Sequence, residues 1–191
     1  SEGSEENARE SSSRTILERS LQTLLNSRVK EVILVVNDQT QEKARQWEDQ
    51  RVKVVFNPEY RKGMSRSIHQ GIRTSDPISE GFLIALGDQP TLKSRTINLL
   101  IEAFQKAEGK IIAPSFQGRR GHPVIFPRKY REELLKLRGD EGGKSILNRH
   151  SKEVLVVPVR SKEVIRDIDT PGDYKEGLKG LGKRLRMEHT S

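Results

Sequence analysis

The most informative stretch of the sequence is Phe82-Leu83-Ile84-Ala85-Leu86-Gly87-Asp88-Gln89-Pro90, in which a short apolar run stops at a carboxylate and a proline follows. An apolar run of this length, bounded by turn residues, predicts a buried parallel β-strand. Ligands of open α/β sheets bind outside the carboxyl ends of such strands, so Asp88 stands where a metal or substrate ligand is expected. An aspartate that caps the following loop or helix explains the same residues equally well.

Apolar runs of similar length recur along the chain and alternate with segments that have helical spacing. The expected strands lie at residues 31–36, 52–56, 82–86, 110–114, 124–126 and 154–157. The expected helices lie at residues 16–25, 41–47, 65–73, 97–104 and 129–137. Strands that alternate with helices predict βαβ units with right-handed crossovers, and therefore an α/β fold with a largely parallel sheet.

The length and composition favour one domain with short tails. Residues 1–13 are rich in serine and glutamate and are expected to be irregular, residues 14–178 form the expected domain, and residues 179–191 form a basic tail. The chain has no cysteine, which excludes a thiol nucleophile, a disulfide and a thiolate metal site. Because no apolar stretch approaches the roughly 18 residues of a membrane helix and no signal peptide is recognisable, we expect a cytoplasmic protein without a membrane partner.

The net charge of +8, from 35 basic and 27 acidic residues, is compatible with two classes of partner. One is nucleic acid, and the other is a small anionic substrate such as a nucleotide. The two signs of charge are mixed along most of the chain, and only residues 180–186 are locally basic. Aromatic residues are few, so no stacking platform for single strands is evident. We therefore expect a small anionic ligand rather than nucleic acid.

The first candidate site is Asn57-Pro58-Glu59-Tyr60-Arg61-Lys62-Gly63-Met64-Ser65-Arg66-Ser67-Ile68, between the end of a strand and the start of a helix. Ser65 is the expected N-cap, and Gly63 permits a close approach of the backbone before it. Free N–H groups at a helix start favour anions, and three basic residues in the stretch add positive charge. A nucleotide phosphate or sugar fits this pattern, and so does an ordinary capped helix.

The second candidate site is Gly118-Arg119-Arg120-Gly121-His122-Pro123-Val124, in which two glycines flank an arginine pair. Arginine suits planar, bidentate recognition of phosphate or carboxylate. A hairpin with a basic turn is the alternative interpretation of the same residues.

The third candidate site is Ile165-Arg166-Asp167-Ile168-Asp169-Thr170-Pro171-Gly172-Asp173-Tyr174. Asp167 and Asp169 point the same way if the segment is extended, and Thr170 followed by Pro171 is typical of a helix start. A capped helix with solvated acidic residues is the alternative.

Taken in order, five motifs of this chain resemble those of the molybdenum cofactor nucleotidyltransferases, and most closely the cytidylyltransferase branch. They are Asn57-Pro58-x-Tyr60-x-x-Gly63-Met64-Ser65-x-Ser67-Ile68-x-x-Gly71, Gly87-Asp88-Gln89-Pro90, Gly121-His122-Pro123-Val124-Ile125-Phe126, Gly139-Asp140-x-Gly142 and Asp167-Ile168-Asp169-Thr170-Pro171-x-Asp173-Tyr174. The resemblance covers about residues 14–175. It implies a Rossmann-like fold of the glycosyltransferase-A type, with helices on both faces of a mostly parallel sheet. It also implies transfer of a nucleoside monophosphate from a nucleoside triphosphate, here CTP, to the phosphate of molybdopterin, with release of pyrophosphate.

The resemblance also implies roles for particular residues. Asp88 would be the catalytic ligand of Mg²⁺, with Asp169 as a second acidic group near the metal. The residues implied at the nucleotide are Asn57, Gly63, Met64, Ser65 and Ser67. The residues implied at the acceptor are Arg119, Arg120, Gly121 and His122. The implied partners are the nucleoside triphosphate, a phosphorylated acceptor of the molybdopterin type, and a molybdoenzyme or its chaperone that receives the product.

One part of the family pattern has no recognisable counterpart in this sequence. The family opens with an apolar strand and a glycine-rich loop that holds the triphosphate and includes a lysine. Here no apolar strand precedes Gly3 or Arg9, and no lysine occurs before Lys30. Two alternatives therefore stay open, a catalytically inactive protein that binds a nucleotide or cofactor on the same fold, and a nucleotidyltransferase that acts on a sugar phosphate.

Overall fold

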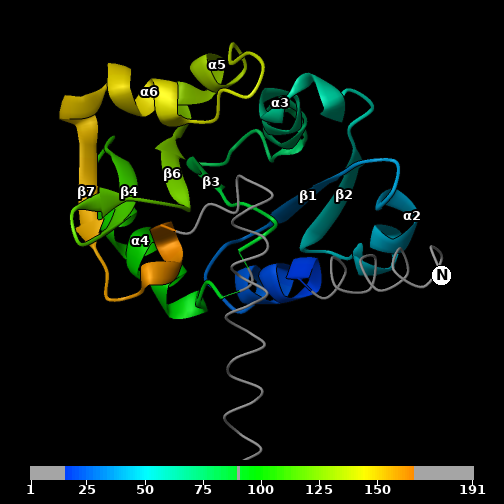
Figure 1. Cartoon of the computed structure of the whole chain (residues 1–191), viewed down its shortest axis with the longest axis horizontal. Coiled ribbons are helices and arrows are strands. Elements are labelled where there is room, and N and C mark those ends of the chain that lie inside the picture. Colours follow the sequence, from blue (N-terminus) through cyan, green and yellow to red (C-terminus); the bar gives the residue numbers. More distant parts are fainter. Residues whose placement is uncertain (1–15, 90, 166–191) are drawn as a thin grey trace, which may run out of the picture.

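The structure is a computed structural model that describes residues 16–89 and 91–165 (Figure 1). The expected irregular segment at residues 1–13 and the expected basic tail at residues 179–191 lie outside the described residues. A helix covers residues 16–25. The strands are β1 (Val32–Val36), β2 (Val52–Phe56), β3 (Gly81–Ile84), β4 (Ile111–Phe116), β5 (Arg119–Arg120), β6 (Val124–Pro127) and β7 (Val154–Pro158). The other helices are α2 (Gln41–Ala44), α3 (Met64–Thr74), α4 (Ser94–Lys106), α5 (Arg131–Leu134) and α6 (Lys144–Arg149).

The strands form the middle layer of an α/β, Rossmann-like fold, as expected. The larger sheet has the order β3-β6-β4-β5. In addition to these pairings, β7 pairs with β4. Parallel pairing holds for β1 with β2 and for β4 with β7, whereas β6 runs antiparallel to both β3 and β4. The expected mostly parallel sheet is therefore a mixed one. The reason is that only residues 117–123 connect β4 to β6, and a parallel crossover needs about a dozen residues or more.

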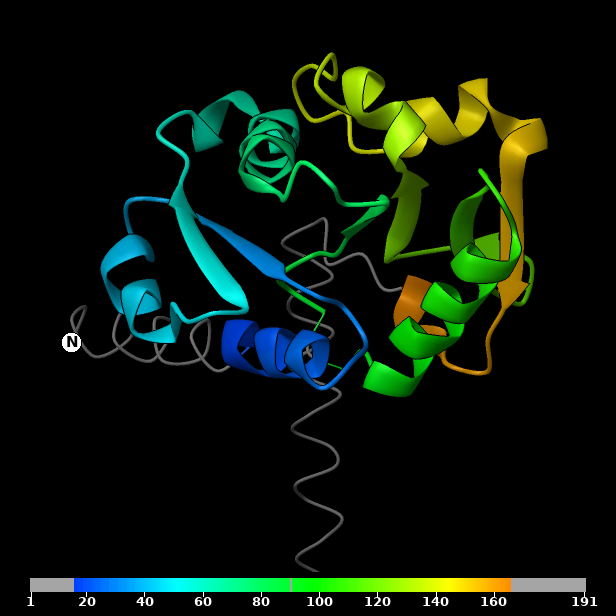
Figure 2. The ribbon, with the colours of Figure 1, turned by 180° about the vertical axis from the view of Figure 1, so that it is seen from behind.

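Alternate residues of the larger sheet face two different layers of helices. Phe82 and Phe126 pack in one cluster with apolar residues of α3, α5 and α6. Their neighbours Leu83 and Ile125 pack in clusters on the side of α4. This two-residue period is the one that a pleated strand imposes on its side chains. The expected helices on both faces are thus confirmed, and Figure 2 shows the same layers from behind.

Strands β1 and β2 form a separate two-stranded sheet within the described part of the chain. Two helices join this pair to the larger sheet, one from each face. Leu24, from the helix over residues 16–25, packs both in the cluster that contains Val32 and in the cluster that contains Ile97. On the opposite face, α3 packs against β1 and β2 and also places Ile68 in the cluster of Phe82. Side-chain packing therefore links the two sheets.

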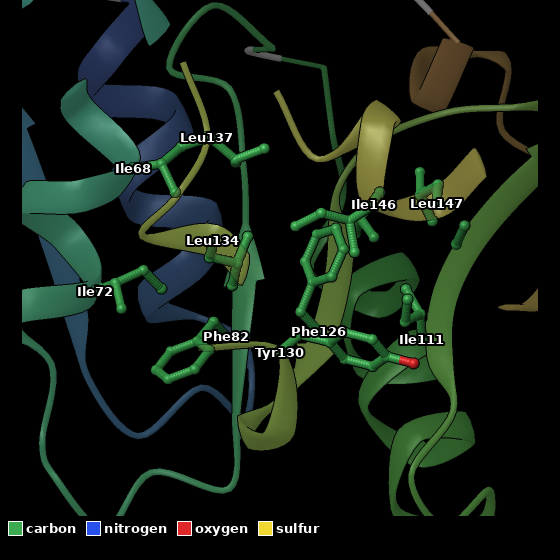
Figure 3. Packing of buried hydrophobic residues seen from close by; sticks show 12 residues of the cluster. Ile68, Ile72, Phe82, Ile111, Phe126, Tyr130, Leu134, Leu137, Ile146 and Leu147 are labelled. Atoms are coloured by element: carbon green, nitrogen blue, oxygen red, sulfur yellow. The ribbon is translucent and has the colours of Figure 1, made fainter. Parts of the chain in front are cut away.

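Phe126 lies at the centre of the cluster beneath α5 and α6 (Figure 3). Its side chain is fully buried, and its ring meets the ring of Tyr130 edge-on, with 6.5 Å between the centroids. A methyl group added at Gly143 would lie 2.4 Å from Cζ of Phe126, so this ring has no free space around it. The packing makes Phe126 the residue on which this half of the core depends.

We predict that Phe126→Ala lowers the free energy of unfolding by about 3–5 kcal/mol, because it removes a large buried ring and leaves a cavity. Leu99→Ala, at a position on α4 where the side chain is 44% exposed, is the matched control and should cost much less. Urea denaturation of the three proteins measures both changes. Equal losses for the two variants would contradict the central position of Phe126.

Candidate functional site

Asn57 follows β2 directly and holds the chain that leads into α3. Its backbone N–H donates to the Val36 carbonyl at 2.8 Å, and its side-chain Oδ1 accepts from the Glu59 N–H at 3.0 Å. Its Nδ2 donates to Oγ of Ser67 at 3.0 Å. Asn57 is only 1% exposed. This residue therefore fixes the end of β2 to the first turns of α3, and its predicted contact with a nucleotide stays a prediction.

The start of α3 is closed by the backbone of another loop. Gly63 is the N-cap of α3, with φ of 107°, a conformation that residues with a side chain rarely adopt. A methyl group at Gly63 would lie 2.3 Å from the carbonyl carbon of Gly139, and the Ser65 N–H donates to the Gly139 carbonyl at 3.0 Å. The prediction of Ser65 as N-cap is wrong, because the helix begins at Met64 and the Gly63 carbonyl accepts from the Arg66 N–H. The Ser65 N–H is thus used inside the protein and is not offered to an anion.

Asp88 lies in a turn beyond the end of β3. The strand ends at Ile84, two residues earlier than expected, because its partner Val124 is the first residue of β6 and Pro123 before it has no N–H group. Asp88 therefore does not end the strand directly. Ser20 ties the turn to the helix over residues 16–25, since its Oγ donates to the Gly87 carbonyl at 3.2 Å. The Asp88 side chain is partly exposed in this position.

Arg119 and Arg120 form the second strand of a hairpin with β4. Arg120 lies opposite Ser115, and Gln117 and Gly118 form the turn with φ of 49° and 78°. Two successive positive φ values are typical of the tight turns that join antiparallel strands. The alternative interpretation of this motif, a hairpin with a basic turn, holds only in part, because the hairpin is present but its turn is Gln117-Gly118 and the two arginines lie in the strand. Both arginines are exposed, and Nη2 of Arg120 donates to Oδ1 of Asn148 at 3.4 Å.

Gly121 and His122 are held by the last 3-10 helix, η5 (Lys162–Ile165). The His122 N–H donates to the Val164 carbonyl at 2.7 Å, and the Gly121 N–H donates to the Pro114 carbonyl at 2.9 Å. A methyl group at Gly121 would lie 1.9 Å from the Val164 carbonyl oxygen, so only glycine fits. The predicted metal ligand Asp169 and its neighbour Asp167 lie outside the described residues.

The register of β3 with β6 brings part of the predicted site to one edge of the sheet. Ile84, the last residue of β3, pairs with Val124, the first residue of β6. Asp88 and His122 therefore extend from the same edge. The described residues contain no group of three or more His, Asp or Glu side chains that could hold a metal ion. A divalent cation at this edge would be held by Asp88 together with phosphate oxygens of a ligand, which is the arrangement that Mg²⁺ commonly takes.

A basic cavity beside α3 is not indicated by any of the sequence motifs. The cavity has a volume of about 660 Å³ and lies between α3 and the loop at residues 135–139. Arg66 and His69 are three residues apart on α3 and therefore share one side of the helix, which was a usable signal. Nothing in the sequence shows that the distant 135–139 loop covers them.

Comparison with known proteins places this geometry in a family. Residues 6–154 match the MobA-like NTP transferase domain. The chain belongs to this family. A molybdenum cofactor cytidylyltransferase of Escherichia coli (strain K12) is 24% identical over 164 residues, which are 84% of this chain and 80% of that protein. A nicotine blue oxidoreductase of Paenarthrobacter nicotinovorans is 24% identical over 165 residues, 82% of this chain and 79% of that protein.

Solved structures share the fold. Rv0371c from Mycobacterium tuberculosis H37Rv has a TM-score of 0.71 and 24% identity, over 86% of this chain and 83% of that chain, and its complex with manganese is also similar. The 4-diphosphocytidyl-2C-methyl-D-erythritol synthase of Anaerococcus prevotii DSM 20548 has a TM-score of 0.69 and 18% identity, over 87% and 86% of the two chains. These likenesses confirm the Rossmann-like nucleotidyltransferase fold that the five motifs indicated. No helix of this NTP transferase domain, within its described residues, is long and apolar enough to cross a membrane.

We predict that Gly63→Ala lowers the free energy of unfolding by about 1–3 kcal/mol, because a side chain at φ of 107° is strained and would also collide with Gly139. Gly71→Ala is the matched control. It lies inside α3, where a methyl group would meet Val35 at 3.7 Å, and should raise stability by about 0.5–1 kcal/mol. Thermal and urea denaturation measure both. A Gly63→Ala protein with unchanged stability but lost nucleotide binding would identify Gly63 as a ligand contact instead.

Proposed function

We propose that this NTP transferase domain moves a nucleoside monophosphate from CTP to a phosphorylated acceptor of the molybdopterin type and releases pyrophosphate. The observation that carries the proposal is the family match over residues 6–154. The choice of CTP is supported by relatives that are named for cytidylyl chemistry, the cytidylyltransferase of Escherichia coli and the diphosphocytidyl methylerythritol synthase. The choice of acceptor is supported by the first of these relatives and by the five sequence motifs.

The reaction requires the two substrates to be positioned, and it requires no covalent nucleophile from the protein. An oxygen of the acceptor phosphate attacks the α-phosphorus of CTP, the bond from that phosphorus to the bridging oxygen breaks, and pyrophosphate leaves with the electron pair. A phosphate monoester is largely ionised near neutral pH, so no general base has to remove a proton. Catalysis then rests on alignment of the two phosphates and on neutralisation of their charge.

In this proposal Asp88 holds a divalent cation, proposed to be Mg²⁺, together with the phosphates of the nucleotide. The cation would neutralise negative charge on the triphosphate and on the pyrophosphate that leaves. The carboxylate fits this role because it is partly exposed in a turn that Ser20 anchors through Gly87. Asp169 remains a proposed second ligand, and it lies outside the described residues.

The nucleotide wall in this proposal is the stretch from Asn57 to Ser67. Asn57 and Ser67 are hydrogen-bonded to each other through their side chains. The Ser65 N–H donates to the Gly139 carbonyl, and the Gly63 backbone packs against Gly139. In this proposal these residues shape the wall. Met64 packs partly buried against the main core cluster and supports the same turn. A rigid wall lowers the cost of ordering a bound ligand.

The acceptor side in this proposal is the exposed hairpin of Arg119 and Arg120 together with Gly121 and His122. Exposed guanidinium groups can form bidentate hydrogen bonds with a phosphate or carboxylate. The backbone of Gly121 and His122 is fixed by Pro114 and Val164, which sets the base of the hairpin. The rigid base and exposed tip suit the recognition of an anionic acceptor.

A nucleotide-binding protein without transferase activity is a second candidate. The two candidates differ in one measurement. A transferase releases pyrophosphate from CTP in the presence of an acceptor, whereas a binding protein retains CTP unchanged.

We predict that Asp88→Ala weakens Mg²⁺-dependent CTP binding by on the order of tenfold or more, because it removes a charged oxygen ligand of the cation. The fold should be retained, since the Asp88 side chain is partly exposed. Asp76→Ala, in the loop between α3 and β3, is the matched control. Calorimetry with CTP, with and without Mg²⁺, measures the effect. Equal affinities for the Asp88→Ala and wild-type proteins would show that the cation is held elsewhere.

We predict that the double variant Arg119→Ala and Arg120→Ala weakens acceptor binding by roughly tenfold or more, while CTP binding changes little. Arg128→Ala, an exposed arginine beyond the end of β6, is the control for loss of charge. Separate titrations with CTP and with a molybdopterin-type acceptor measure the two affinities. A double variant that loses CTP but keeps the acceptor would reverse the assignment of the two sides of the cleft.

A further inference from the structure

The basic cavity beside α3 has a wall of cationic side chains and one histidine. The polar residues of the wall are Lys62, Arg66, His69, Lys136 and Arg138. The first three come from α3 and the turn before it, and the last two come from the loop at residues 135–139. The volume of about 660 Å³ lies within the range of small-ligand sites. The cavity is large enough for a phosphorylated small molecule.

His69 is the buried polar group of this wall. The residue is 6% exposed, and its contact with the Leu137 backbone falls short of well-formed hydrogen-bond geometry, so the ring nitrogens are poorly satisfied within the described residues. Burial lowers the pKa of His69, and the positive charges of Arg73 and Arg66 lower it further, while the hydrogen-bonding contact with the Leu137 backbone and the charge of Glu59 partly offset these effects. The ring is therefore neutral near pH 7 and has an N–H group to donate. A buried polar ring with poorly formed hydrogen bonds is costly, so a polar ligand inside the cavity would stabilise this arrangement.

The charges around His69 are only partly balanced. Glu59 accepts a hydrogen bond from Lys62 and lies 3.6 Å from Arg66, and these contacts lower the pKa of its carboxyl group. Lys136 and Arg138 have no ion-pair partner in the part of the chain that the structure describes. The lining of the cavity thus holds four cationic residues and no carboxylate, and Glu59 pairs with only two of the four. A water molecule would satisfy the His69 ring but would leave this excess of positive charge.

The cavity shares Lys62 and Arg66 with the stretch proposed as the nucleotide wall, but His69, Lys136 and Arg138 lie outside that stretch. Successive helical residues are about 100° apart around the axis, so Ser67 and His69 lie about 160° apart when measured the short way. Ser67 is the residue that bonds Asn57 at the end of β2, whereas His69 and Arg66 line the cavity. A ligand in the cavity would therefore contact residues that the nucleotide does not.

We propose that this cavity binds the phosphate group of a small anionic ligand, through a site centred on His69, Lys136 and Arg138 that borders the proposed nucleotide wall at Lys62 and Arg66. Arg138 offers a planar pair of donors, Lys136 offers a point charge, and the His69 ring offers a third donor from the buried end. Inorganic phosphate, pyrophosphate and a phosphorylated sugar share this chemistry. The inference does not depend on the transferase reaction.

The test follows the His69 ring itself. Protein labelled at histidine is titrated with phosphate, pyrophosphate and ribose 5-phosphate, and ring proton–carbon spectra are recorded. The His69 signal is assigned by its loss in His69→Gln. We expect a saturable shift of this signal that sodium chloride at equal ionic strength does not produce. Saturation by inorganic anions alone would identify an inorganic ligand, and a stronger response to ribose 5-phosphate would identify a phosphorylated organic one.

Arg138→Gln and Lys136→Gln should each weaken the response by roughly tenfold, because each removes one charged donor. Both side chains lie on a surface loop, so at least one of these variants is expected to fold. Arg95→Gln, an exposed arginine of α4, is the matched control and should respond as the wild type does.

Asp88→Ala separates this proposal from the proposed function. It should lose Mg²⁺-dependent CTP binding and keep the full His69 response. The proposal is overturned if no anion produces a saturable shift, if sodium chloride produces the same shift, or if Arg138→Gln and Lys136→Gln both respond like the wild type.

Discussion

The contact between Gly63 and Gly139 is the constraint on which the start of α3 and the loop beside it depend. The two backbones lie so close that no side chain fits between them. This contact closes the first turn of α3 through the Ser65 N–H, and it brings the 135–139 loop over the outer side of the helix. One pair of glycines thus sets both the wall proposed for the nucleotide and the roof of the basic cavity.

Much of the layer arrangement could be predicted from the sequence, because the apolar runs and helical spacings are local. The runs at residues 31–36 and 52–56 predicted β1 and β2 almost to the residue. The end of β3 could not be predicted in the same way, since it depends on where β6 begins, about 40 residues later. The antiparallel direction of β6 follows from the short connection at residues 117–123, which the alternation of strands and helices did not reveal.

In the candidate site, too, the features set by local sequence could be predicted and those set by tertiary contacts could not. The exposed hairpin at Arg119 was one of two interpretations of its motif, and its glycine and charge pattern is local. The N-cap of α3 was assigned to Ser65 because serine has the better intrinsic preference, but the close approach of Gly139 makes Gly63 the cap. The surroundings of His69 also depend on tertiary contacts. A histidine in the middle of a helix gives no sign in the sequence that a loop almost 70 residues away covers it.

The separation of β1 and β2 from the larger sheet affects how the molecule opens. Backbone ladders transmit order directly from strand to strand, but here that route is interrupted between β1 and β3 within the described chain. Cooperativity between the two halves must therefore pass through helix side chains such as Leu24 and Ile68. Such a domain has a natural place for sub-global opening, in which the β1–β2 half loosens while the half around Phe126 stays folded.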